Sequence, residues 1–187
     1  MYSHPSLDPN GEWIEIYNAG MTSLNLAGYK IGDEETQGKA EGMYQLPVGY
    51  SLGPGQTLVI ANMASQFIAD YGFQPDYELA ESDPDVPNLV KYTTWGTGII
   101  SLANIGDELL LLDPLDQVVD ALSYGDSQWA FSPSCPTVAP GHSLERRPAN
   151  HDTDSAADWV EQGQPAPGQV TLSAWDRLVA WFWAIFH

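Results

Sequence analysis

Near its middle the chain reads Leu109-Leu110-Leu111-Leu112-Asp113-Pro114-Leu115-Asp116-Gln117-Val118-Val119-Asp120-Ala121-Leu122. Two short apolar runs flank a turn, because Asp and Pro favour turn conformations and Pro interrupts a central strand. Apolar segments of this length, bounded by turn residues, are typical of strands. We therefore predict a β-hairpin with strands over 109–112 and 118–122, closed by residues 113–116.

The segment Glu12-Trp13-Ile14-Glu15-Ile16-Tyr17 predicts a strand near the start of the sequence. A side-chain period of two places its even-numbered residues on one face and its odd-numbered residues on the other. Both faces are partly apolar. We expect a strand that is covered on both sides, with each acid at an end or rim where water reaches it.

The rest of the chain indicates more short strands, one short helix and exposed loops. Phe67, Ile68 and Tyr71 recur at a helical spacing, and Gly72 stands where a helix ends, so we predict a helix over 64–71. Acidic and Pro residues over 76–87, and the stretch 127–140, predict exposed loops. Further strands are predicted over residues 29–31, 43–46, 56–61, 88–92, 108–112, 117–124 and 142–146. The predicted class is all-β with antiparallel pairing.

Composition excludes several classes of function. The 187 residues carry 25 Asp and Glu against 6 Lys and Arg, a formal charge of −19, so attraction to nucleic-acid phosphates is not expected. Cys135 is the only cysteine, which excludes an intrachain disulfide and a zinc cluster of cysteines. The length fits one domain.

Several segments, taken in order over residues 11–170, carry a family resemblance. They are Gly11–Asn18, Leu24–Asp33, Leu46-Pro47 with Leu52–Gln56, Asn104–Leu111 with Val118–Gly125, and His142–Arg146 with Asp152–Asp154, Asp158-Trp159 and Pro165–Gly168. Together they resemble the lamin tail domain of bacterial or archaeal type. That family comprises immunoglobulin-like β-sandwiches that occur in nuclear lamins and in many bacterial and archaeal surface or secreted proteins.

The resemblance implies a domain that we place over residues 1–170, and the apolar, aromatic composition of the end of the sequence predicts a hydrophobic helix over 171–187. It implies a non-catalytic binding or scaffolding module of a surface, envelope or secreted protein, although residues 1–5 show no signal peptide. Family members usually carry a strand before the first loop, where this chain has only Met1 and Tyr2. An unpaired edge on the first strand is therefore expected.

Three acids close in sequence, Asp152, Asp154 and Asp158, are candidate ligands for calcium, which binds six to eight oxygens in irregular loops. The spacing of an EF-hand is absent. Alternatively, Asp152 and Asp154 accept main-chain hydrogen bonds in a turn or pair with Arg146 and Arg147. We favour this alternative, and no cofactor other than calcium is considered.

Catalytic motifs are absent from the sequence. Four scattered histidines, His4, His142, His151 and His187, are expected at the surface or in turns. Cys135 stands in a Pro-rich loop, where exposure is possible, but nothing basic is near it in sequence to lower its pKa. We expect no enzyme, with a hydrolase, or an accessory domain of one, as the alternative.

The end of the sequence is apolar almost all round, from residue 175 to residue 186. This helix is too short to span a bilayer by itself. It can lie in a membrane interface, fold back onto the sandwich or onto a second copy, bind a partner protein, or begin a longer spanning segment. The residues expected to make these contacts are Trp175, Leu178, Trp181, Phe182, Trp183 and Phe186.

Overall fold

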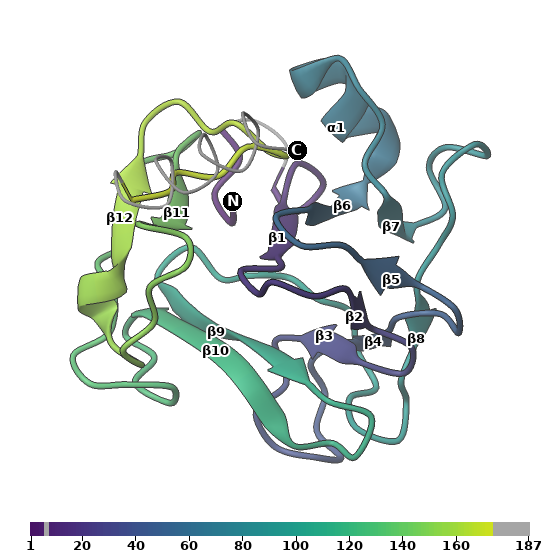
Figure 1. Cartoon of the computed structure of the whole chain (residues 1–187), viewed down its shortest axis with the longest axis horizontal. Coiled ribbons are helices and arrows are strands. Elements are labelled where there is room, and N and C mark those ends of the chain that lie inside the picture. Colours follow the sequence, from purple (N-terminus) through teal and green to yellow (C-terminus); the bar gives the residue numbers. More distant parts are fainter. Residues whose placement is uncertain (6–7, 174–187) are drawn as a thin grey trace.

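Two sheets form the layers of the fold in the computed structural model of the chain, which describes residues 1–5 and 8–173 (Figure 1). A three-stranded sheet has the order β1-β6-β7, and a five-stranded sheet has the order β10-β9-β3-β4-β8. Two small ladders, β2-β5 and β11-β12, complete the described part. The elements are β1 Trp13–Tyr17, β2 Leu24–Asn25, β3 Lys30–Gly32, β4 Met43–Gln45, β5 Ser51–Leu52, β6 Thr57–Met63, α1 Ala64–Tyr71, β7 Tyr77–Ala80, β8 Val90–Lys91, β9 Gly106–Leu112, β10 Val118–Gly125, β11 Ser143–Arg146, a 3-10 turn Ala156–Asp158 and β12 Trp159–Gln162.

The predicted hairpin is confirmed as β9 and β10, which pair antiparallel with a register shift between Val118 and Asp120. The side chains of its four consecutive leucines alternate between the two faces of the sheet. Leu110 and Leu112 are fully buried with Met43 on one face of the sheet. Leu109 and Leu111 pack against the main core on the other face. The leucine run is continuous because both faces of β9 are covered.

The strand β1 is also covered on both sides, as its sequence predicts. Ile14 lies in the main core between the layers. Trp13 lies on the opposite face, where its ring meets Phe67 of α1 edge-on at 6.4 Å and its indole N–H donates to the Tyr71 hydroxyl at 3.0 Å. One expectation was wrong: Glu12 does not reach water, since it is only 3% exposed.

The helix α1 has the predicted bounds. Its first main-chain donor, Ala64 N–H, binds Glu78 Oε2 at 2.9 Å. At its end, Gly72 has φ 78° and donates to the Ile68 carbonyl, the left-handed ending that glycine adopts without strain. Ala64 and Phe67 are its buried residues. The helix therefore covers the outer face of the three-stranded sheet.

The predicted loop over 76–87 is wrong in part. It contains β7, which pairs parallel to β6, so pairing is not antiparallel throughout. Glu78 of β7 is 0% exposed because it accepts hydrogen bonds from Ala64, Ser82 and Asp83 main-chain N–H groups. Burial opposes ionisation of Glu78, but hydrogen bonds, led by that of Ser82, outweigh it and lower its pKa. Glu78 is therefore an internal residue held by main-chain donors, not an acid of an exposed loop.

The second predicted loop, over 127–140, is likewise not exposed throughout. Cys135 is only 1% exposed, which excludes the exposed thiol considered from the sequence. Its main-chain N–H donates to the Ser123 carbonyl at 2.9 Å, and its carbonyl accepts from Gly125 N–H at 2.8 Å. The segment thus pairs alongside the end of β10 and is held against the core.

The chain is therefore an all-β, immunoglobulin-like sandwich with one short internal α-helix in its described part. The hydrophobic C-terminal helix predicted over 171–187 falls mostly on residues 174–187, outside the described residues. Residues 171–173 have no regular secondary structure. Within residues 1–5 and 8–173, no helix has the length and apolar character required to cross a membrane.

Candidate binding cleft

A cleft of about 730 Å³ separates the layers along β1 and β10. Each of these strands is the last in its sheet among the described residues. The aliphatic part of the lining comes from both layers and includes Ile14, Ile16, Leu26, Leu109, Leu111, Leu122 and Leu144. The volume lies within the range of small-ligand pockets, roughly 300 to 1,000 Å³. We call this space the β1–β10 cleft.

The cleft leaves interior positions of the sandwich incompletely covered. Leu109, Leu111 and Leu122 are half-buried, although their side chains pack against the main core. By contrast, Leu110 and Leu112, on the other face of β9, are 0% exposed. Half-buried aliphatic side chains around a large cleft form an apolar surface that an additional segment can cover.

The β11-β12 ladder forms one wall of the cleft. Arg146 of β11 donates two hydrogen bonds to the Asp120 carboxylate of β10, at 2.9 and 2.8 Å. Its guanidinium also lies over the ring of Trp159, 4.7 Å from the centroid, and these two residues are cross-strand partners. Asp152 Oδ2 lies 3.3 Å from Arg146 Nη1. The ion pair with Asp120 ties this wall to the edge of the five-stranded sheet.

Two donors in this wall lack acceptors. Arg146 Nε and Trp159 Nε1 are buried and have no hydrogen-bond partner in the part of the chain that the structure describes. Both residues line the cleft. A buried N–H without an acceptor costs on the order of 1–3 kcal/mol. An occupant that offers a carbonyl or carboxylate oxygen satisfies them once the side chains that cover them move aside.

The free edge of β1 is covered in part by other segments of the chain. Met1 and Trp13 exchange two main-chain hydrogen bonds of 2.8 and 3.1 Å, although residues 1–2 form no strand. Further along, Glu15 Oε2 accepts a hydrogen bond from Gly168 N–H at 2.5 Å. Burial raises the pKa of Glu15 to about 7. The predicted edge is thus real, but the chain partly covers it.

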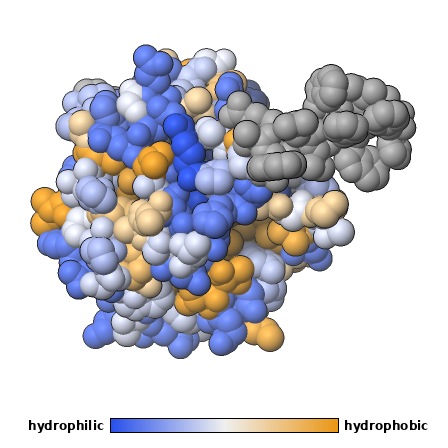
Figure 2. Space-filling model, turned by 60° about the vertical axis from the view of Figure 1, so that its left-hand side comes forward, coloured by the Kyte–Doolittle hydropathy of each residue, from blue (hydrophilic) through white to orange (hydrophobic). Residues whose placement is uncertain are grey.

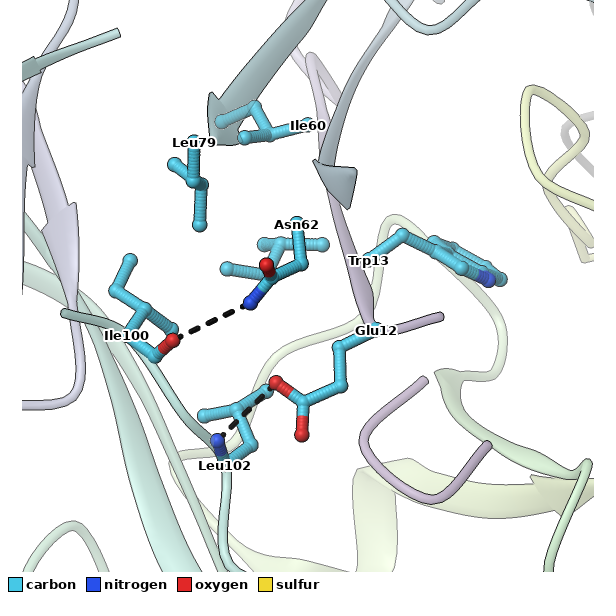
Figure 3. A pocket seen from close by; sticks show the side chains of 8 residues that line it. Glu12, Trp13, Ile60, Asn62, Leu79, Ile100 and Leu102 are labelled. Atoms are coloured by element: carbon cyan, nitrogen blue, oxygen red, sulfur yellow. Dashed lines mark hydrogen bonds between the residues drawn. The ribbon is translucent and has the colours of Figure 1, made fainter. Parts of the chain in front are cut away.

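A second, much smaller cavity of about 10 Å³ lies beside Glu12 and Asn62 (Figure 3). Glu12 Oε2 accepts from Leu102 N–H at 3.2 Å, while Oε1 is buried without a partner among the described residues. Burial, together with Asp8, raises the pKa of Glu12 to about 9. The cavity holds about one water molecule at most, so it is no substrate site.

The candidate calcium ligands Asp152, Asp154 and Asp158 are placed differently from one another. Asp152 pairs with Arg146 and accepts a hydrogen bond from Asp154 N–H at 3.0 Å. Asp158 is buried, and both of its oxygens accept from Thr153. The carboxylates of the three do not form a group with ligand atoms within 4.8 Å of one another among the described residues. This geometry is that of a hydrogen-bonded turn.

The structure brings together another acidic group, which the sequence did not indicate. Single carboxylate oxygens of Glu34, Glu35 and Glu41 lie within 4.8 Å of one another. However, Glu34 already accepts hydrogen bonds from the main-chain N–H groups of Thr36 and Glu41, at 3.0 and 2.9 Å. The group is explained by the turn that it stabilises.

The groups considered for catalysis are dispersed. Burial raises the pKa of Cys135 to about 11, so its thiol is protonated at neutral pH and is a poor nucleophile. His142 Nδ1 lies 2.6 Å from Glu161 Oε1, and His4 Nε2 lies 3.1 Å from Asp70 Oδ2. His151 is exposed. Trp175, Leu178, Trp181, Phe182, Trp183, Phe186 and His187 lie outside the described residues.

The sequence profile of the Lamin Tail Domain family matches residues 1–126. The chain belongs to the lamin tail domain family. The match includes β1 to β10 and therefore both strands that border the β1–β10 cleft, whereas the β11-β12 wall lies beyond it. The resemblance seen in the sequence spanned residues 11–170, so the family match starts earlier and ends sooner. Among curated proteins, no match was found.

Proposed function

We propose that this lamin tail domain is a non-catalytic binding or scaffolding module of a surface, envelope or secreted protein, and that its β1–β10 cleft receives an apolar polypeptide segment. The observation that carries the proposal is the cleft itself, which has a volume of about 730 Å³, a mostly apolar lining and a position between two terminal strands. Terminal strands and apolar grooves are both used in peptide recognition.

The polar groups of the cleft support a polypeptide as the occupant. Arg146 Nε and Trp159 Nε1 need acceptors, and a polypeptide carries a carbonyl oxygen at every residue. Arg146 is the one Lys or Arg among the described residues that line the cleft, whereas four acids line it: Glu15, Asp120, Glu145 and Asp152. A segment with aliphatic or aromatic side chains and few acids fits this lining best.

A binding role is also supported by the chemistry outside the cleft. Cys135 is held as a thiol, and the small cavity at Glu12 is too small for a substrate. The charge of −19 keeps the surface hydrophilic, and on the face in Figure 2 the hydrophobic side chains form separate patches among hydrophilic ones. These features suit a soluble module in an extracellular or envelope setting.

The test is a selection of short random peptides, displayed on phage, against the intact chain. An enriched peptide is synthesised with a fluorescent label, and its affinity is measured by anisotropy. Val119 lines the cleft and is 53% exposed, so Val119→Glu adds a charge there with little cost to folding. We expect this substitution to weaken peptide binding at least about tenfold.

The matched control is Val118→Glu on the same strand. Val118 is 49% exposed but does not line the cleft. Its substitution should leave the affinity unchanged. Equal affinities in both variants and the unsubstituted chain would place binding elsewhere, and a selection without enriched peptides would contradict the proposal. A hydrolase screen on the same protein should show no turnover.

A further inference from the structure

The last described residues of the chain lie beside the cleft. Gln169, Val170 and Thr171 line the β1–β10 cleft, and the Thr171 carbonyl accepts from Ala149 N–H at 2.9 Å. Just before them, Gly168 is bound to Glu15 of β1 at 2.5 Å. The described residues that precede 174–187 are therefore fixed at the rim of the cleft, by hydrogen bonds of Gly168 and Thr171.

The composition of this segment matches the lining. Eleven of its fourteen residues are apolar, and they include five aromatics: Trp175, Trp181, Phe182, Trp183 and Phe186. Asp176 and Arg177 cancel in charge, so the acidic rim does not repel it. As a polypeptide it carries main-chain carbonyl oxygens, and these are the acceptors that Arg146 Nε and Trp159 Nε1 lack among the described residues.

The length of the segment and its effective concentration favour the segment of the same chain, rather than that of a second copy, as the occupant of the cleft. Fourteen residues reach about 21 Å as a helix, so the segment is long enough to extend from the rim into the cleft. A segment tethered at the rim has an effective concentration on the order of millimolar. Two copies that each carry a charge of −19 repel each other, and the same charge opposes an anionic membrane.

We infer that residues 174–187 occupy the β1–β10 cleft of their own chain, so that a partner must displace them in order to bind. This inference rests on the proposed function, because it assigns the first occupant of the same site. Tryptophan and phenylalanine side chains enter the space that Leu109, Leu111 and Leu122 leave uncovered. The segment then acts as an internal competitor for partners.

The test uses the full chain with the photoreactive residue p-benzoylphenylalanine in place of Trp183. After irradiation, we expect a product of monomer mass whose crosslinks map to residues of the cleft. Val119→Glu should reduce these crosslinks at least about fivefold, whereas Val118→Glu should not. The same probe at Trp129, which is exposed and outside the cleft, is the control for non-specific reaction.

Three other results would overturn the inference. A product of dimer mass assigns the cleft to the segment of a second copy. Lipid adducts in place of cleft crosslinks, with vesicles of phosphatidylcholine and phosphatidylglycerol present, assign the segment to the membrane. Crosslinks elsewhere on the domain, or none, show that the segment leaves the cleft empty.

Peptide binding separates failure of this inference from failure of the proposed function. If selected peptides bind the cleft of the intact chain while the probe reacts elsewhere, only the inference fails. If neither peptides nor the probe reach the cleft, both fail. If the inference holds, Trp181→Ser together with Trp183→Ser should tighten peptide binding several-fold, because the internal competitor is weakened.

Discussion

The two faces of β9 contrast a closed core with an open one. On one face, Leu110 and Leu112 are fully buried with Met43, and Tyr92 and Trp95 pack over them. On the other face, Leu109 and Leu111 border a cleft of about 730 Å³. The same residue type, in the same strand, is fully buried core on one face and lines the β1–β10 cleft on the other.

The largest expected effect comes from truncating the closed face. Leu110→Ala should lower the free energy of unfolding by about 3 kcal/mol, because it leaves a cavity in a packed cluster. Leu111→Ala should cost about 1 kcal/mol, since its side chain is already half-buried beside open space. Urea unfolding monitored by circular dichroism measures both. Equal losses would remove the contrast between the faces.

The next prediction compares how two acids make stability depend on pH: Glu12, buried beside the small cavity, and Glu15, which lines the cleft. Burial raises the pKa of Glu12 to about 9 and that of Glu15, at the cleft, to about 7, both from an ordinary value of 4.5. The folded state therefore binds protons more tightly than the unfolded chain, so stability is full below pH 4.5 and falls as the pH rises towards each folded pKa. We expect a higher Tm at pH 5 than at pH 8.

Substitution by glutamine assigns this pH dependence to each acid. Glu12→Gln should raise the free energy of unfolding at pH 8 by at least about 2 kcal/mol, because a neutral amide replaces a group that must take up a proton. Glu15→Gln should give a smaller gain, since its pKa is shifted less. Glu78 and Asp158 respond to pH in the opposite sense, because their pKa values are lowered in the folded state. Their contribution to stability is therefore lost as the pH falls below about 4. A Tm that is the same at pH 5 and pH 8 would contradict the predicted contribution of Glu12 and Glu15.

Adding volume gives a smaller effect. Ala61 is 0% exposed in the cluster with Trp13 and Phe67, so Ala61→Leu should destabilise the chain by about 2 kcal/mol through overpacking. Ala121 lines the cleft and is half-buried, so Ala121→Leu should change stability by less than about 1 kcal/mol. Thermal melts of the two variants compare these positions directly.

The smallest expected effect is that of calcium. Asp158 already accepts hydrogen bonds from Thr153, and Asp152 is paired with Arg146. Addition of calcium should therefore leave the midpoint of thermal unfolding within about 1 °C, since a ligand shifts stability only if it binds the folded state. A rise that is lost in Asp152→Asn would show a metal site in this turn.

Local patterns in the sequence predicted most of the fold. The hairpin of β9 and β10, the two covered faces of β1 and the bounds of α1 follow from periodicity, turn residues and a helix-ending glycine. The strands β2, β5, β7 and β12 were not predicted, because they are short and their pairing depends on contacts distant in sequence. Glu78 shows the reason: its acidic side chain indicated a loop, but main-chain donors of α1 and Ser82 hold it inside.

The candidate site was less accessible to sequence reasoning. An apolar run such as 109–112 does not reveal which of its leucines will be covered, because that depends on how far β1 and β10 stand apart. Arg146 does pair with Asp152, as the sequence predicted, but its bidentate partner is Asp120 of β10, which the sequence did not indicate. The aromatic end of the sequence was predicted to be a contact surface, which stays a prediction, and the cleft that residues 169–171 line was not predicted.

The most direct measurement is methyl NMR of the intact chain, with labelled leucines, while a selected peptide is titrated in. The account predicts that the signals of Leu109, Leu111 and Leu122 shift with peptide concentration and that those of Leu110 and Leu112 stay in place. Shifts confined to the closed face, or to methyl groups distant from the cleft, would contradict it.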